Sequence, residues 1–196
     1  MKVLILGANG QIAQVATELF LERTDAQLTL YLRKAKRLRV INPARERVVE
    51  GDVLDLKTLQ AAMAGQDVVY ANLSGPMKQQ TQNIVTAMVN TGVKRLIFVS
   101  SMGIYGEVPG QRYRSILDPY RDSAELIEAS GLDYTIIRPA WLNDNDEINY
   151  GTTQKGEPFQ NASGVVSRKS VADLVVKLAT KPDIAIRQSL GVHKRS

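Results

Sequence analysis

Short apolar runs alternate along the chain with segments in which apolar residues recur every three or four positions. The first run is Val3–Leu6, and the segment after it places Ile12, Val15 and Leu19 on one face of a helix. Runs of the first kind predict buried strands, and segments of the second kind predict amphipathic helices. The predicted strands are Val3–Leu6, Leu28–Leu32, Arg47–Glu50, Asp67–Leu73, Arg95–Val99, Thr135–Ile137 and Gln188–Val192.

Amphipathic segments separate these strands. The predicted helices are Gln11–Phe20, Leu56–Met63, Gln79–Asn90, Tyr120–Ala129 and Val171–Ala179. Asp55 and Ser170 are predicted N-caps, because their side chains can accept hydrogen bonds from N–H groups of the following first turn. Gly65 is predicted to end the second helix.

The alternation of strands and helices predicts an α/β fold. We expect a single Rossmann-like, doubly wound domain over residues 1–196, with a parallel sheet and helices on both faces. Two long polar segments, Gly103–Pro119 and Ala140–Gly164, interrupt the alternation. Both begin at the carboxyl end of a predicted strand, where open α/β sheets bind ligands. They are therefore the predicted substrate side.

Composition excludes several kinds of site. The chain has no cysteine and one histidine, His193, so thiolate metal sites, disulfides and multi-histidine sites are not expected. It has no apolar run of membrane-spanning length and no leader with a cleavage site, which predicts a cytoplasmic protein without membrane association. The net charge of +5 suits either nucleic acid or an anionic cofactor. The chemistry must come from hydroxyls, carboxylates, cations or a borrowed cofactor.

A glycine turn follows the first predicted strand and opens the first helix. In Gly7-Ala8-Asn9-Gly10, Gly7 permits a sharp turn and Gly10 lets the backbone approach a pyrophosphate, while Ala13 allows close helix–strand packing. The helix N-terminus offers unpaired N–H groups to the phosphates. Two glycines could serve the turn alone, but the strand–turn–helix context favours a dinucleotide cradle.

The end of the second strand indicates which dinucleotide is bound. An acidic residue here would bind the ribose hydroxyls and favour NAD. The chain instead has Arg33, followed by Lys36 and Arg37. A guanidinium can hold a 2′-phosphate through two parallel hydrogen bonds. Arg33 and Arg37 therefore favour NADP over NAD, although a solvated basic loop remains an alternative.

The ends of the third and fourth strands add further candidate cofactor contacts. Asp52, next to Val53, can accept from an adenine amino group, or it can cap the following helix. Leu73 and Ser74 follow the fourth strand, where the middle of a dinucleotide would pass. The order of these signals along one βαβαβ half is typical of a dinucleotide-binding fold.

From Met1 to about Ala179 the chain resembles the short-chain dehydrogenase/reductase superfamily, in its atypical NAD(P)H-binding branch. That branch includes NmrA-like regulators, NADH-flavin reductase-like proteins and biliverdin-reductase-like enzymes. The residues that carry the resemblance are Gly7–Ile12, Arg33, Gly51–Val53, Phe98–Gly106 and Ser130–Pro139. The resemblance implies that Gly7, Asn9, Gly10, Gln11 and Ile12 hold the pyrophosphate. It also implies that Ser100 and Pro139 contact the cofactor, with Pro139 beside the nicotinamide.

The superfamily's usual catalytic set is incomplete in this chain. That set is a Ser or Thr after the fifth strand and a Tyr-x-x-x-Lys pair on the next helix, which moves a proton to or from a carbinol oxygen. Ser101 aligns with the serine, but Tyr120 is followed four residues later by Ala124. Ser101 and Tyr120 are the candidate catalytic residues. A role of Ser101 in contacting the cofactor is an equal alternative.

The missing pair favours an acceptor that needs no such proton relay. Met102, Tyr105, Trp141 and Tyr150 are predicted to line a flat apolar slot for a flavin or quinone. The alternative for Trp141 is a buried structural role. With only residues 140–196 after Pro139, a sugar-nucleotide substrate domain is not expected.

Three functions are therefore compared. The first is an NADPH-dependent reductase acting on a small planar acceptor. The second is a non-catalytic NADP-binding sensor with a protein partner, as the NmrA-like resemblance suggests. The third is a nucleic-acid binder, which is disfavoured because no aromatic residues are interleaved with the cations.

Overall fold

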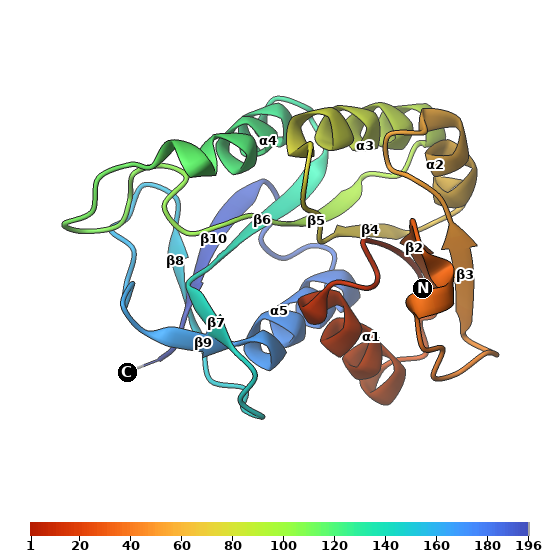
Figure 1. Ribbon diagram of the computed structural model, residues 1–196, viewed down its shortest axis with the longest axis horizontal. Coiled ribbons are helices and arrows are strands. Elements are labelled where there is room, and N and C mark those ends of the chain that lie inside the picture. Colours follow the sequence, from red (N-terminus) through yellow and green to blue (C-terminus); the bar gives the residue numbers. More distant parts are fainter. Residues whose placement is uncertain (196) are drawn as a thin grey trace.

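The computed structural model describes residues 1–195, apart from the side chain of Arg37, and its main feature is an eight-stranded sheet. All neighbouring strands of this sheet are parallel except the pair β10–β8 (Figure 1). From one edge to the other, the strands are β3 (Glu46–Glu50), β2 (Gln27–Leu32), β1 (Lys2–Leu6), β4 (Val68–Ala71), β5 (Arg95–Val99), β6 (Asp133–Pro139), β10 (Gln188–His193) and β8 (Gly151–Gln154).

Helices cover both faces of the sheet. α1 (Gln11–Arg23) and α5 (Arg168–Thr180) pack side by side on one face. The other face carries α2 (Leu56–Met63), α3 (Met77–Thr91) and α4 (Asp118–Glu128), as Figure 1 shows. Across residues 1–195, no helix has both the length and the apolar character needed to cross a membrane.

Strand β4 shows how the two cores form. All of its residues are buried, and successive side chains of a strand point to opposite faces. Val68 and Tyr70 join the core under α1 and α5, whereas Val69 and Ala71 join the core under α2, α3 and α4. A strand buried on both faces reads as a continuous apolar run, as predicted. The α/β, Rossmann-like fold is confirmed.

The strand order reverses at β1, which lies between β2 and β4. In its last residue pair, Leu6 aligns with Tyr31 on one side and with Ala71 on the other. Doubly wound sheets bind ligands beside such a reversal, at the carboxyl ends of the strands. The Gly7–Gly10 turn therefore lies at the expected ligand edge.

Most predicted elements are confirmed with small changes at their ends. The Asp55 side chain caps α2 by accepting from the Thr58 N–H, and Gly65 follows that helix with a φ of +73°. The predicted Ser170 cap is wrong, because Ser167 caps α5 by accepting from the Ser170 N–H. The helix starts earlier than its apolar residues indicate, since its first turn carries the polar Arg168 and Lys169.

The predicted loop 140–164 contains two short strands that the sequence pattern does not reveal. β7 (Trp141–Asn143) pairs with β9 (Val165–Ser167) in a separate two-stranded sheet, and β8 extends the edge of the main sheet. These strands have three or four residues, and β8 reads Gly-Thr-Thr-Gln. So short and polar a segment carries no alternating hydrophobic signal.

Candidate cofactor and acceptor site

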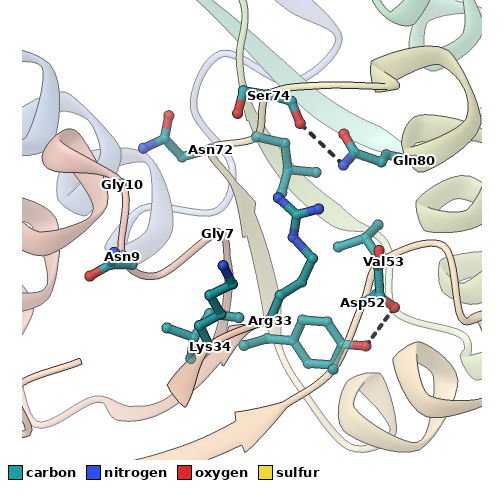
Figure 2. Close-up of a pocket in the computed structure, with 14 residues that line it drawn as sticks. Gly7, Asn9, Gly10, Arg33, Lys34, Asp52, Val53, Asn72, Ser74 and Gln80 are labelled. Carbon is teal, nitrogen blue, oxygen red and sulfur yellow. Dashed lines mark hydrogen bonds between the residues drawn. The ribbon is translucent and has the colours of Figure 1, made fainter. Parts of the chain in front are cut away.

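A cavity of about 360 Å³ lies at the carboxyl ends of β3, β2, β1 and β4. Loop residues that are far apart in sequence line this cavity together, as the close-up in Figure 2 shows. The lining includes the predicted residues Gly7, Asn9, Gly10, Arg33, Asp52, Val53, Leu73 and Ser74. It also includes Tyr31, Leu32, Lys34, Gly51, Asn72 and Gln80, for which no cofactor contact was predicted.

The two glycines let the turn after β1 lie against the end of β4. Gly7 has a φ of +76°, and a Cβ atom there would lie 2.2 Å from the carbonyl oxygen of Asn72. A Cβ atom at Gly10 would lie 2.5 Å from the side-chain nitrogen of Asn72. Gly7 therefore excludes larger residues through a backbone contact within the protein itself, whereas a larger residue at Gly10 would require the Asn72 side chain to move. The sharp turn predicted at Gly7 agrees with this geometry.

Gly7→Ala is expected to lower the free energy of unfolding by about 2–4 kcal/mol, because the new methyl group adds a left-handed backbone strain to a clash with Asn72. Gly65→Ala is the matched control, since its φ is +73° and a Cβ atom there meets nothing within 4 Å. In the control, the free energy of unfolding should fall by only about 1 kcal/mol, because the backbone conformation is the sole source of strain. Urea unfolding of both variants measures the difference, and equal losses would show that the Asn72 contact is unimportant.

The N-terminus of α1 faces this cavity without a side-chain cap. The Gly10 N-cap provides no side-chain hydrogen bond, and the first turn of the helix carries no acidic residue. The Asn9 side chain instead accepts a hydrogen bond of 3.2 Å from Gln14. Free N–H groups and the positive end of the helix dipole suit an anionic group. Of the two predicted helix contacts, Gln11 is exposed, and Ile12 is buried as an anchor of the helix.

Cations enter the cavity from the end of β2. Figure 2 shows the side chains of Arg33 and Lys34 lying between the Gly7 turn and Asp52. The loop is fixed by Glu50, whose carboxylate accepts from the Ala35 N–H at 2.9 Å. The predicted contact from the Arg37 side chain falls outside the part of the chain that the structure describes.

Tyr31 forms the wall of the cavity beside Asp52. Its hydroxyl donates to the Asp52 carbonyl oxygen at 2.9 Å, and burial, reinforced by the charges of Asp55 and Asp52, raises the pKa of Tyr31 to about 12. The ring also explains Gly51, where a Cβ atom would lie 2.4 Å from the hydroxyl oxygen. The Asp52 carboxylate accepts from the Leu54 N–H, so this turn is rigidly placed.

A second, smaller cavity of about 120 Å³ lies past the carboxyl ends of β5 and β6. The predicted residues Ser101, Met102, Pro139 and Trp141 line it. The Ser101 hydroxyl donates to the Met102 carbonyl oxygen at 3.2 Å. Trp141 is 57% exposed, which rules out the buried structural role considered for it. Ser100 lies just inside the sheet edge, with a buried hydroxyl that has no hydrogen-bond partner among residues 1–195.

Three predicted tyrosines do not line either cavity. Tyr105 is turned into the protein, where its hydroxyl donates to Glu128 at 2.7 Å and burial raises its pKa. Tyr150 packs against α5 and donates to Asp173 at 2.8 Å. Tyr120 packs on the core under α4. Phe159, another aromatic residue of the segment 140–164, is buried against Gly191.

A buried ion pair that the sequence analysis missed anchors the loop after β5 to the sheet. Arg138 is fully buried in β6 and pairs with Glu107. The Glu107 carboxylate also accepts from the backbone N–H groups of Gly103 at 3.0 Å and Tyr105 at 2.9 Å. Arg138 in turn donates to Ser189 on β10. One buried pair thus fixes the loop after β5 that forms a wall of the second cavity.

Comparison with known proteins identifies the family. The model of a family described as NAD(P)H-binding matches residues 7–182. The chain belongs to this NAD(P)H-binding family. The matched region begins at the first glycine of the turn and includes both cavities. The resemblance found in the sequence is therefore confirmed.

Solved structures of similar proteins cover the whole chain. A Rossmann-fold NAD(P)-binding family protein from Shigella flexneri is 42% identical, with a TM-score of 0.88, over 100% of this chain and 94% of that one. A short-chain dehydrogenase/reductase of the wide type from Veillonella parvula, solved in complex with NADP, is 30% identical. Its TM-score is 0.87, over 100% of this chain and 95% of that one.

Curated relatives of this NAD(P)H-binding chain are more distant. A protein from Bacillus subtilis named as an uncharacterized sugar epimerase is 28% identical over 90% of this chain and 86% of its own length. An NAD(P)H azoreductase from Xenophilus azovorans is 25% identical over 92% of this chain, which spans 64% of the azoreductase. The relatives thus include an NAD(P)H-dependent reductase.

Proposed function

We propose that this protein is an NADPH-dependent reductase that passes a hydride to a small planar acceptor of the flavin or quinone type. The observation that carries the proposal is the pair of cavities along one edge of the sheet. The first has the cations and free helix N–H groups that suit a dinucleotide. The second has an apolar lining with an exposed tryptophan. An NAD(P)H azoreductase among the relatives supports a reductase function.

The residues of the first cavity fit NADP better than NAD. Arg33 and Lys34 lie where an acidic residue would bind the ribose hydroxyls of NAD. The N–H groups at the start of α1 would hold the pyrophosphate, and Asn72 and Ser74 border the path toward β5. Asp52 would face the adenine end. The NADP complex of the Veillonella parvula relative supports the same choice.

The order of strands supports a position for the nicotinamide end of such a cofactor beside the second cavity. Neighbouring strands of a sheet lie about 4.8 Å apart, and β5 and β6 follow β4 in the sheet. A dinucleotide that starts at β2 and crosses β1 and β4 reaches Ser100 and Pro139. Pro139 lines the second cavity, whereas the Ser100 hydroxyl is buried and Ser100 lies outside both cavity linings. Ser101 would contact the ring or the acceptor.

The reaction requires little from the protein beyond orientation. When bound, NADPH would supply a hydride, which consists of one proton and two electrons, and would thereby become NADP⁺. The acceptor takes up this hydride together with one proton from water, and so becomes a dihydroflavin or hydroquinone. Trp141 and Met102 would hold the acceptor ring flat against the cofactor, and such positioning accelerates reactions strongly. No Tyr-Lys pair is required, because solvent reaches the open cavity.

Steady-state NADPH oxidation with a panel of flavins and quinones tests the proposal. We expect at least one acceptor to react well above the protein-free background. Trp141→Ala should lower kcat/KM for that acceptor by about tenfold or more, because it removes the stacking surface. The exposed Val89→Ala on α3 is the control and should leave the rate unchanged.

One result would contradict the reductase, and another would contradict the location of its acceptor. If NADPH binds tightly but every acceptor reacts at the background rate, the protein is a non-catalytic NADP-binding sensor. If Trp141→Ala and Val89→Ala react alike, the acceptor does not lie in the second cavity.

A further inference from the structure

The second cavity has a cationic rim on its loop side. Arg112 and Arg114 line it from the segment that precedes α4, and both residues are exposed. Within residues 1–195, neither guanidinium forms an ion pair with a carboxylate. A pair of free cations around an apolar cavity is therefore available for a ligand.

The carboxylates near this rim are occupied by other partners. Glu107 is buried and pairs with Arg138. Asp118 accepts a hydrogen bond of 2.7 Å from the Tyr113 hydroxyl and pairs with Arg121 at 3.2 Å. The guanidinium of Arg121 also lies 5.4 Å from the centre of the Tyr113 ring. Arg121 is also shared with Asp122 and Glu125, so the cations of this rim that pair with no carboxylate within residues 1–195 are Arg112 and Arg114.

Besides the two arginines and the polar Ser101, Gln111 and Tyr113, the lining is apolar and suits a ring. Met102, Val108, Leu117, Pro139 and Trp141 contribute to it. A ligand that fits both the cationic rim and the apolar lining has a flat apolar body with an acidic substituent at one end. A neutral ring would offer no anionic partner to the two guanidinium groups, which would then remain hydrated.

We propose that the acceptor is an anionic planar molecule whose phosphate, sulfonate or carboxylate binds Arg112 and Arg114. This inference rests on the proposed function, because it names the acceptor class of that reductase. Guanidinium groups hold such anions through paired hydrogen bonds. Because both side chains are exposed, solvent and salt weaken the attraction. We therefore expect an anionic acceptor to bind about tenfold more tightly than a neutral one.

Riboflavin and FMN test the inference, because they share one ring system and differ in a single phosphate. The readout is the dissociation constant of each flavin for the complex of the protein with NADP⁺, measured by flavin fluorescence. Wild type should bind FMN about tenfold more tightly than riboflavin, and Arg112→Gln/Arg114→Gln should remove this difference. Raising the ionic strength from about 0.02 M to about 0.5 M should reduce it in wild type.

The control variant removes two positive charges elsewhere. Lys94→Gln/Lys181→Gln alters exposed residues near the amino end of β5 and the end of α5, and should keep the wild-type preference for FMN. An equal preference in all three proteins would overturn the inference. So would a loss of NADP⁺ affinity in the double arginine variant without a change in the flavin ratio, because the arginines would then serve the cofactor.

The binding measurement separates this inference from the proposed function. If FMN binds through the arginines but no flavin or quinone of the panel is reduced, the anion site stands and the reductase proposal fails. If flavins and quinones are reduced with no preference for anionic members, the reductase stands and the inference fails. Naphthoquinone and naphthoquinone sulfonate, compared between the same variants, repeat the test with a second ring.

Discussion

Arg138→Met is expected to lower the free energy of unfolding by about 3–5 kcal/mol. The guanidinium is fully buried and pairs with Glu107, which is itself 6% exposed. Methionine fills much of the same volume but leaves the Glu107 carboxylate buried without its cation. The loss of one partner of a buried pair costs more than the pair contributes, since the remaining charge is uncompensated. Urea unfolding measures the change.

A second substitution separates charge from packing. Arg138→Met/Glu107→Gln removes both charges, and we expect it to recover part of the stability lost by the single variant. The glutamine keeps an acceptor for only some of the bonds from Gly103 and Tyr105, so recovery should be incomplete. Arg168→Met breaks the pair between the partly buried Arg168 and the exposed Asp144, and should cost less than about 1 kcal/mol. If Arg138→Met costs as little as Arg168→Met, the buried pair does not hold the loop.

Arg33→Asp is expected to reverse the preference between NADPH and NADH. The wild-type chain should bind NADPH about tenfold to about thousandfold more tightly, because one or two charge-assisted hydrogen bonds hold the 2′-phosphate. The aspartate repels that phosphate and can accept from the ribose hydroxyls of NADH. Calorimetric titration of both cofactors measures the ratio.

A charge-matched control separates this contact from the overall field of the protein. Arg47→Asp changes the charge by the same amount on β3, where the residue is exposed and does not line the cofactor cavity. It should keep the wild-type order of affinities. Equal binding of NADPH and NADH by the wild-type chain would refute the assignment of Arg33.

The sequence predicted the main sheet and the first cavity well, for a physical reason. Buried parallel strands require continuous apolar runs such as Val3–Leu6, and the residue after each run must lie at the carboxyl edge. Gly7, Arg33, Asp52 and Ser74 therefore meet in one cavity as a consequence of topology. Strand order alone brings these residues together, without any detail of side-chain packing.

The second cavity was predicted less well, because its residues come from irregular segments. A loop carries no periodic signal for the direction of a side chain, so Tyr105 and Tyr150 were assigned to a slot from which they turn away. The Glu107–Arg138 pair is equally invisible in sequence, since its partners lie on different elements. The Arg-Pro dipeptide at the end of β6 was the one available signal for a charge placed inside the sheet.

A crystal structure of the protein with NADPH is the measurement that tests the central claim most directly. The account predicts the 2′-phosphate against Arg33, the pyrophosphate at the start of α1, and the nicotinamide beside Pro139 with one face open to the second cavity. A nicotinamide ring covered on both faces by protein, or a 2′-phosphate directed away from Arg33, would contradict it.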